Sequence, residues 1–333
     1  MTLTSTEVHL ARRPRGMAVP DDFAFVTREL ADPGAGEVLV QNLYFSVDPY
    51  MRGRMNEAQS HAAGYRLNEA MYGGAIGRVV ASRNDDFQDG DLVSSSLGWR
   101  EGFVSDGDGL NRLPETSLPV TVHMGPLGLT GRTAYDGLLG AAEMREGDTV
   151  FVSGAAGAVG SIAGQIARLK GCRTIGSAGS PEKVAFCREI GFDHAFDYHD
   201  GELLAHLCEG APDGLDVYFD NVGGDHLEAA LAHMRLLGRI ALCGGISRYN
   251  DTALAPGPRN LLVAIGLRLT LRGFVVGNYP KLREPFEEEM ASWLKSGQII
   301  WRETIREGIR SAPDAFIGLF RGENIGKMIV KLA

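Results

Sequence analysis

Three glycines at a fixed spacing carry the clearest chemical signal in this chain. Gly154, Gly157 and Gly160 follow an apolar run at residues 149–153, and the residues after them carry apolar side chains at helical spacing. A strand, a glycine turn and a helix in this order open a Rossmann βαβ unit. The glycines let the backbone turn tightly and approach a pyrophosphate, which is the chemistry of dinucleotide binding.

The helix after these glycines is expected to supply further contacts to the phosphates. Its first residues, Ala158 and Val159, present backbone N–H groups at the positive end of the helix dipole. An alternative is that the glycines serve only helix packing and a strand turn. The flanking strand, the amphipathic helix and the next strand favour cofactor binding.

The end of the second predicted strand indicates which dinucleotide is bound. An NAD enzyme usually places a carboxylate there to hold the ribose 2′-hydroxyl. After the strand at 173–178 this chain instead has Gly179 and Ser180, and Lys183 follows. Small residues and an amine suit a 2′-phosphate, so the sequence predicts NADP(H). Lys183 is also compatible with an ordinary solvated helix residue.

Strands and helices alternate between residues 130 and 297, which predicts a parallel sheet with helices on both faces. Ser180 as N-cap and Pro181 in the first turn begin a helix near residues 182–190, and Gly191 ends it. The strands of this sheet are expected at residues 149–153, 173–178, 194–198, 215–220, 239–243 and 269–276. Six such strands suit a doubly wound sheet.

The rest of the chain has a different pattern, which predicts a second, β-rich domain. Short β-like runs separated by turn residues occur at 37–47, 74–82, 91–99 and 327–333. The expected α/β fold therefore has a β-rich domain at residues 1–128 and 298–333 and a Rossmann domain at residues 129–297. We expect a cleft between the two domains.

Composition narrows the possible functions. The 333 residues are 44% hydrophobic and carry a formal net charge of −9. No basic block offsets this charge, so binding to nucleic acid or to an anionic membrane surface is not expected. Neither a run of roughly 20 apolar residues nor an apolar signal core is present. We therefore expect a cytoplasmic protein.

The cysteines argue against a metal site. They lie at Cys172, Cys187, Cys208 and Cys243, without any C-x-x-C pair. This spacing fits neither a disulfide framework nor a zinc cluster. The predicted β-rich domain contains no cysteine, and His61 and His123 do not by themselves make a zinc site. We expect no bound metal.

Several further motifs point to one family. They are SVDPYMRGRM at 46–55, GLTGRTAYDGL at 128–138, YFDNVGG at 218–224, GRIALCGGISRYN at 238–250 and NIGKMIVKLA at 324–333. With the glycine segment, they resemble the zinc-independent medium-chain dehydrogenase/reductase branch of leukotriene B4 12-hydroxydehydrogenase and prostaglandin reductase. That branch also contains curcumin-reductase-like proteins and alkenal double-bond reductases.

The resemblance spans nearly the whole chain and has structural implications. It implies a GroES-like catalytic domain beside the Rossmann domain, NADPH as the cofactor, and a homodimer. Residues 124–135 depart from the family's usual Met-Pro-Gly-Leu-Thr-Ala-Tyr stretch. The substrate range of the family is therefore not carried over to this chain.

The resemblance also extends the predicted cofactor site. It implies that Tyr198 contacts the 2′-phosphate, although packing of a strand-end aromatic side chain is an alternative. Asn221 follows a predicted strand at the edge where ligands bind in open α/β sheets, and an asparagine turn before glycine fits equally well. The other cofactor contacts implied by the resemblance are Cys243, Gly244, Gly245, Ile246, Ser247, Tyr249, Phe274, Val275, Val276 and Asn324. Cys243 would contribute its backbone.

Tyr249 and Tyr50 are the candidate catalytic residues. A phenol is a hydrogen-bond donor at neutral pH and stabilises negative charge on a carbonyl oxygen. In related reductases the tyrosines of these two motifs line the substrate cleft. Either side chain is also compatible with a core aromatic residue whose hydroxyl has a partner.

These observations together predict a metal-independent, NADPH-dependent reductase of the carbon–carbon double bond of enals and enones. Hydride would reach the β-carbon, and the resulting enolate would be stabilised by Tyr249 and the nicotinamide ribose 2′-hydroxyl before a proton from tyrosine or water reaches the α-carbon. The alternatives are a quinone oxidoreductase, an allylic alcohol dehydrogenase and a sensor that binds NADPH without turnover.

Overall fold

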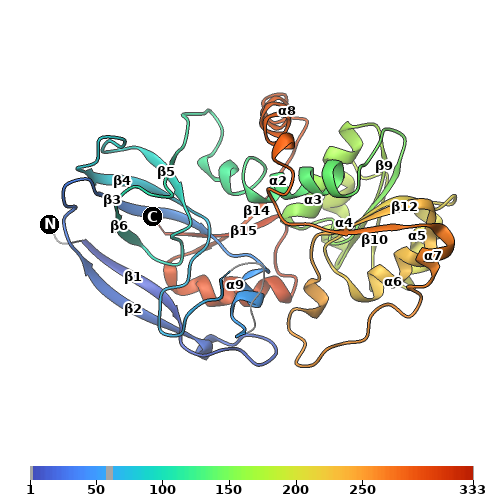
Figure 1. Ribbon diagram of the computed structural model, residues 1–333, viewed down its shortest axis with the longest axis horizontal. Coiled ribbons are helices and arrows are strands. Elements are labelled where there is room, and N and C mark those ends of the chain that lie inside the picture. Colours follow the sequence, from blue (N-terminus) through green and yellow to red (C-terminus); the bar gives the residue numbers. More distant parts are fainter. Residues whose placement is uncertain (1–2, 58–62, 333) are drawn as a thin grey trace. The chain divides into compact units, whose positions relative to one another are not determined.

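The chain divides into two compact units in a computed structural model that describes residues 3–57 and 63–332 (Figure 1). The first unit comprises Met1–Met124, Glu303–Asn324 and Met328–Ala333. The second comprises Gly125–Arg302 and Ile325–Lys327.

A six-stranded parallel sheet forms the centre of the second unit, as the sequence predicts. Its strands are β8 (Thr149–Val152), β9 (Arg173–Ala178), β10 (His194–Asp197), β11 (Leu215–Asp220), β12 (Met234–Leu242) and β13 (Thr270–Gly273). Their spatial order is β10-β9-β8-β11-β12-β13. The chain thus changes direction across the sheet between β8 and β11, which is where doubly wound sheets bind their ligands.

The two helices at residues 158–169 and 181–189 are central to the site. The helices of this unit lie between the strands along the chain and on either side of them. They are α3 (Ala158–Leu169), α4 (Pro181–Glu189), α5 (Leu203–Gly210), α6 (Gly224–His233) and α7 (Val263–Leu267), with α2 (Leu129–Tyr135) before the sheet and α8 (Arg283–Lys295) after it. In α3, Ile162 and Ile166 are buried. Ser180 caps α4 by accepting a hydrogen bond from the Lys183 N–H, so the prediction for the start of this helix is confirmed.

Two predicted strands have different lengths in the structure. β13 ends at Gly273 rather than at residue 276, because its pairing with β12 stops at Leu242 and the chain turns away. β12 begins five residues earlier than predicted, at Met234 instead of residue 239. This early part is irregular, since Leu237 has a φ of 62° and the register with β11 shifts there.

The first unit is built around an antiparallel sheet. Its strands are β3 (Val38–Ser46), β4 (Ala75–Ser82), β5 (Leu92–Ser95), β6 (Gly102–Ser105), β7 (Asn111–Arg112), β14 (Glu303–Glu307) and β15 (Lys327–Lys331). β1 (Leu3–Leu10) and β2 (Phe23–Leu30) form a separate two-stranded sheet. Short helices α1 (Met51–Arg54) and α9 (Ala312–Phe320) complete this unit.

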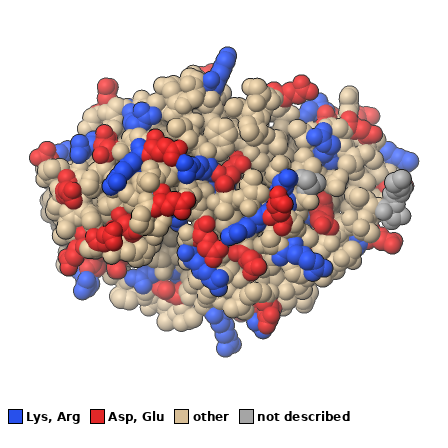
Figure 2. Space-filling view, turned by 180° about the vertical axis from the view of Figure 1, so that it is seen from behind, with Lys and Arg blue, Asp and Glu red and all other residues tan. Residues whose placement is uncertain are grey.

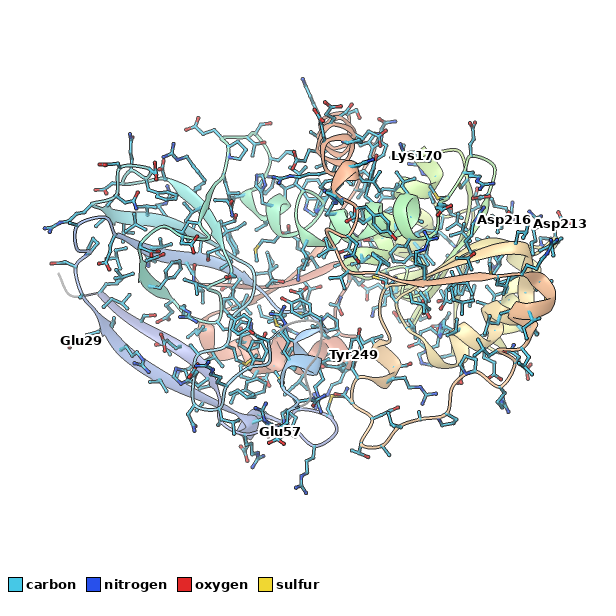
Figure 3. The ribbon with its side chains drawn as sticks, viewed as in Figure 1. Glu29, Glu57, Lys170, Asp213, Asp216 and Tyr249 are labelled. Carbon is cyan, nitrogen blue, oxygen red and sulfur yellow. The ribbon has the colours of Figure 1, made fainter. Side chains whose placement is uncertain are left out.

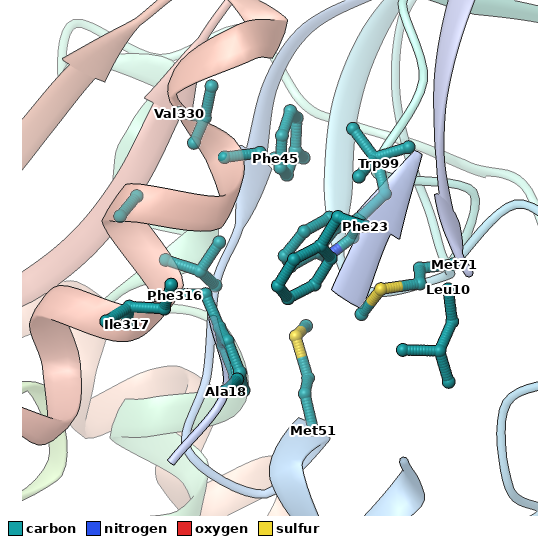
Figure 4. Packing of buried hydrophobic residues seen from close by; sticks show 14 of the residues in the cluster. Leu10, Ala18, Phe23, Phe45, Met51, Met71, Trp99, Phe316, Ile317 and Val330 are labelled. Atoms are coloured by element: carbon teal, nitrogen blue, oxygen red, sulfur yellow. The ribbon is translucent and has the colours of Figure 1, made fainter. Parts of the chain in front are cut away.

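Trp99 lies at the centre of the core of the first unit (Figure 4). Its ring stacks on Phe23 with the centroids 6.0 Å apart, and Phe316 of α9 meets it edge-on at 6.2 Å. The strand predicted at residues 91–99 is therefore wrong at its end. β5 stops at Ser95, and Trp99 takes a φ of 62° that turns its side chain into the core.

Charged side chains are distributed over the surface. Figure 2 shows acidic and basic residues intermixed on the face that it presents. Of the helices in the described residues, none combines the length and the apolar character needed to cross a membrane.

Candidate functional site

The glycine turn after β8 has the tight geometry that close approach of a phosphate requires. Gly154 has a φ of 63°, a conformation that side chains rarely adopt. Gly157 is the N-cap of α3. A Cβ on Gly160 would lie 2.3 Å from the Gly154 carbonyl oxygen, so only glycine lets the first turn of α3 pack this closely on the loop. This cradle fits a pyrophosphate.

The N-terminus of α3 can bind an anion. Ala158 and Val159 are its first two residues and are partly exposed. The N–H groups of a first helical turn lack intrahelical acceptors, and the helix dipole adds positive charge there. The loop is held in place because Ala155 N–H donates to the Ser177 carbonyl at 2.9 Å.

The ends of β9 and β10 bring Tyr198, which is predicted to contact the 2′-phosphate, beside Gly179. Gly179 follows β9, and a Cβ there would lie 2.9 Å from the Tyr198 hydroxyl oxygen. Tyr198 N–H donates to the Ala178 carbonyl at 3.0 Å, which fixes this residue beside the end of β9. Lys183 lies in the first turn of α4, and partial burial lowers the pKa of its amine. A phosphate at this place would favour the protonated amine.

Aromatic contacts hold the ring of Tyr198. The His226 ring of α6 meets it edge-on at 5.0 Å, and the His199 ring lies 4.2 Å from it. Tyr198 therefore packs in part as a strand-end aromatic residue, which is the alternative to a phosphate contact. The residue is still 36% exposed, so part of it is accessible to a ligand.

Asn221 follows β11 and ties this strand to β8. Its side-chain amide Nδ2 donates to the Ser153 carbonyl at 2.8 Å, and its backbone N–H donates to Ser153 Oγ at 3.0 Å. Its cofactor contact stays a prediction.

Sequence reasoning passed over Asp220, the last residue of β11. Its side chain is buried and accepts several hydrogen bonds from the turn that follows. An acidic residue directly after the apolar run at residues 217–219 was the available signal, because a buried carboxylate needs several donors.

The segment after β12 runs along the same edge of the sheet. Cys243 and Gly244 donate their N–H groups to the Asp220 carbonyl at 2.9 and 3.0 Å. Burial raises the pKa of the Cys243 thiol to about 12, so this thiol is protonated at neutral pH. Ile246 N–H donates to the Asn221 carbonyl at 3.3 Å. The structure thus brings the predicted residues 243–247 beside the turn that contains Asn221.

Tyr249 follows the short 3-10 turn Ile246–Arg248 (Figure 3). Its hydroxyl oxygen accepts a hydrogen bond from the Gly245 N–H at 3.2 Å. Burial raises the pKa of Tyr249 above its ordinary value, so the phenol keeps its proton at neutral pH. An oriented phenol of this kind can donate its proton to a carbonyl oxygen on which negative charge develops.

Phe274, Val275 and Val276 follow the end of β13. The Phe274 ring meets Phe219 of β11 edge-on at 6.2 Å. Val275 is 40% exposed and donates its N–H to the Asn278 side chain at 2.8 Å. The three residues therefore leave the sheet as a turn, and the nicotinamide contacts assigned to them stay predictions.

The first unit holds the other two predicted site residues. Tyr50 directly precedes α1, and the Arg54 guanidinium lies 4.8 Å from its ring centroid. Burial raises the pKa of Tyr50. Asn324 lies between α9 and β15. The roles assigned to Tyr50 and Asn324 stay predictions.

The histidines considered as metal ligands offer little support for a zinc site. His123 is partly buried, and burial lowers its pKa. His61 lies outside the described residues. Among the described residues, no group of three histidine, cysteine, aspartate or glutamate side chains could hold a metal ion.

Two family models match the chain. One, described as the N-terminal domain of oxidoreductase, matches residues 6–113. The other, described as zinc-binding dehydrogenase, matches residues 158–296.

Individual proteins resemble the chain over nearly its whole length. The NADPH-dependent curcumin reductase of Escherichia coli is 41% identical over 330 residues, which cover 97% of this chain and 96% of that protein. The NADP(+)-dependent 2-alkenal reductase of Nicotiana tabacum is 41% identical over 313 residues, covering 92% and 91%. The crystal structure of CurA from Vibrio vulnificus in complex with NADPH matches with a TM-score of 0.93 and 38% identity, covering 98% and 99%. The chain therefore belongs to the zinc-independent alkenal reductase branch of the medium-chain dehydrogenase/reductase superfamily.

Proposed function

We propose that this protein is an NADPH-dependent reductase of the carbon–carbon double bond of α,β-unsaturated aldehydes and ketones. One observation carries the proposal: two relatives, each 41% identical over more than nine-tenths of their length, are named as reductases of curcumin and of 2-alkenals. A 2-alkenal is by definition an α,β-unsaturated aldehyde. The protein is accordingly an NADP-dependent oxidoreductase.

The second unit has the features that NADPH binding requires. Gly154, Gly157 and Gly160 make the close turn below the pyrophosphate, and the first turn of α3 offers its N–H groups. We assign the 2′-phosphate to Lys183 and Tyr198, which flank Gly179. When bound, NADPH supplies the hydride.

Tyr249 supports the chemistry in this proposal. Reduction of an enal at its β-carbon moves negative charge onto the carbonyl oxygen. The Tyr249 hydroxyl, oriented by the Gly245 N–H, donates a hydrogen bond to that oxygen and stabilises the enolate. A proton from Tyr249 or from water then reaches the α-carbon and completes the saturated product.

We assign the substrate-binding role to the first unit. Tyr50 is its candidate substrate contact, and Asn324 its candidate contact to the cofactor. Support for Tyr50 comes from the Arg54 guanidinium beside its ring, a charge that would favour an electron-rich substrate group close by.

We also propose a homodimer located in the cytoplasm. β13 is an edge strand, and edge strands offer unpaired backbone groups to a second chain. Nearby, Leu262 and Ile265 are 77% and 74% exposed, which is typical of an interaction surface. All four cysteines are free, which suits a reducing compartment. Light scattering of the purified chain tests the dimer, and Leu262→Asp with Ile265→Asp should give a monomer.

The loss of NADPH absorbance tests the activity. The chain is incubated with NADPH and a 2-alkenal, a quinone, or no acceptor, and the product is identified by mass spectrometry. We expect NADPH consumption with the 2-alkenal and a saturated aldehyde as product. An allylic alcohol, or consumption with the quinone alone, would overturn the proposal. Binding of NADPH without turnover would indicate a sensor.

A further inference from the structure

Asp220 is a buried carboxylate at the end of β11, only 1% exposed. Its Oδ1 atom accepts hydrogen bonds from the Tyr218 hydroxyl at 2.7 Å, from the Val222 N–H at 2.9 Å and from the Gly223 N–H at 2.7 Å. Ser153 Oγ, at the end of β8, lies 3.3 Å from the same atom. These donors compensate the cost of burying the carboxylate.

The turn that Asp220 holds uses backbone conformations that glycine adopts readily. Gly223 has a φ of 71° and a ψ of −158°, and Gly224 has a φ of 55°. Such conformations are nearly restricted to glycine, and because glycine has many accessible conformations, surrounding contacts must select this one. The two N–H groups that donate to Asp220 are contacts of this kind.

The end of β11 and this turn also position the segment after β12. The Asp220 carbonyl accepts from the N–H groups of Cys243 and Gly244. One step further along, the Val222 carbonyl accepts from Ser247 Oγ at 2.6 Å and from the Ser247 N–H at 3.2 Å. The start of this segment is thus held by the end of β11, and Ser247 is held by the turn.

This segment ends at the candidate catalytic tyrosine. The Tyr249 hydroxyl accepts from the Gly245 N–H at 3.2 Å. A Cβ on Gly244 would lie 3.1 Å from the same hydroxyl oxygen, so the phenol rests directly on this glycine pair. Hydrogen bonds joined by short stretches of backbone therefore lead from the Asp220 carboxylate through Val222 and Ser247 to the phenol.

We propose that Asp220 is a positioning residue that sets the orientation of the Tyr249 hydroxyl through the turn after β11. The proposal rests on the function proposed above, in which Tyr249 stabilises the enolate. Asp220 itself does not touch the substrate in this arrangement. Its carboxylate fixes the N–H groups of Val222 and Gly223, the Val222 carbonyl holds Ser247, and the segment that contains Ser247 presents the phenol.

A double-mutant cycle tests the path. Asp220→Ala removes the acceptor, Asp220→Asn keeps an oxygen at the same place, and each is combined with Tyr249→Phe. Asp220→Ala should lower kcat about 10- to 100-fold with a smaller change in the KM for NADPH, because it disturbs one transition-state donor. Asp220→Asn should remain within about threefold of the wild type, since the amide oxygen accepts the same N–H groups.

The proposal predicts different effects of Asp220→Ala in two tyrosine backgrounds. In the Tyr249→Phe background, Asp220→Ala should cost less than about threefold, because the group on which it acts is already removed. Tyr135→Phe is the matched control, since this phenol donates to Glu289 at 2.8 Å on another side of the unit. In that background Asp220→Ala should keep its full effect. Additive losses with Tyr249→Phe, or a silent Tyr249→Phe, would overturn the proposal.

Hydrogen exchange of the full chain without cofactor gives a readout independent of activity. In Asp220→Ala the amides of Val222, Gly223 and Gly245 should exchange faster, while those of the sheet core stay protected. Unchanged exchange at these amides would overturn the proposal. If the wild type reduces no enal, the proposed function fails, and exchange still tests the network.

A second variant covers the case in which Asp220→Ala does not fold. Ser247→Ala removes the side-chain bond to the Val222 carbonyl at an exposed position. It should show the same non-additivity with Tyr249→Phe and the same faster exchange at Gly245. Additive losses in the double variant of Ser247→Ala and Tyr249→Phe would also contradict the proposed path from Asp220 to Tyr249.

Discussion

The hydroxyl oxygen of Tyr249 accepts a hydrogen bond from the backbone N–H of Gly245, four residues earlier in the chain. Because the oxygen is the acceptor in this bond, the phenol proton points elsewhere and can be donated to a substrate. Burial also raises the pKa of Tyr249, so the proton stays in place at neutral pH. The segment thus holds a protonated phenol in a fixed orientation.

Removing the Tyr249 hydroxyl should slow the reaction without weakening the binding of NADPH. We expect Tyr249→Phe to lower kcat about 10- to 100-fold, the usual cost of losing one donor to a developing oxyanion. The dissociation constant for NADPH should change by less than about twofold, since the Tyr249 ring, which would make the predicted cofactor contact, is kept. Steady-state kinetics with a 2-alkenal and NADPH titration by fluorescence measure the two quantities. An unaltered kcat would remove Tyr249 from the mechanism.

Lys183 should determine the preference for NADPH over NADH. Its loss removes a charge-assisted contact to the 2′-phosphate, which is worth roughly 2 kcal/mol, or about 30-fold in the dissociation constant. We expect Lys183→Ala to raise the dissociation constant for NADPH by about this factor and that for NADH by less than about threefold. Lys295→Ala, at an exposed position in the last turn of α8, is the control. Equal losses for both cofactors would contradict the 2′-phosphate assignment.

The sequence predicted the Rossmann sheet because its signals are local. Apolar strands, the cap at Ser180 and the glycine spacing depend on neighbouring residues, and all appear in the structure. Strand ends were less predictable, since pairing with another strand decides them. β13 stops where β12 no longer pairs with it, and an apolar pattern through residue 276 could not reveal this.

The hydrogen bonds around Asp220 could not be predicted from the sequence, for a related reason. Ser153 and Asp220 are 67 positions apart, and their contact exists because β8 and β11 are neighbours in the sheet. Only the topology makes this pair adjacent. Likewise, a positive φ at Trp99 could not be expected from its residue type, because core packing imposes it.

Gly160 should not tolerate a side chain. A Cβ there would lie 2.3 Å from the Gly154 carbonyl oxygen, so either α3 or the glycine turn must move. We expect Gly160→Ala to lower the free energy of unfolding by about 1–3 kcal/mol, as overpacking does. NADPH binding should weaken at least about tenfold, because the phosphate cradle is displaced. Urea unfolding and NADPH titration measure the two effects.

A matched variant separates this clash from the general cost of changing a helical glycine. Gly266 lies in α7, and a Cβ there would meet nothing within 4 Å. Gly266→Ala should leave NADPH binding unchanged and raise helix stability slightly. A Gly160→Ala protein that binds NADPH like the wild type would contradict the assigned role of the cradle.

His226 should make the protein less stable in mild acid. Its ring is 5% exposed, lies parallel to Phe151 and meets Tyr198 edge-on, and burial lowers its pKa to about 4. An unfolded histidine has a pKa of about 6.5, so the folded state disfavours the protonated ring. The stability due to the neutral ring is therefore fully present above about pH 6.5 and is lost as the pH falls toward about 4.

The variant His226→Phe keeps an aromatic ring at this place and removes the titration. We expect the free energy of unfolding of the wild type to fall between pH 7 and pH 4 by up to about 3 kcal/mol more than that of His226→Phe. Urea unfolding followed by tryptophan fluorescence at several pH values measures the difference. His199→Phe changes an imidazole with 62% side-chain exposure beside Tyr198, and is the control. Parallel pH profiles for the wild type and His226→Phe would show that the buried imidazole does not cause the acid sensitivity.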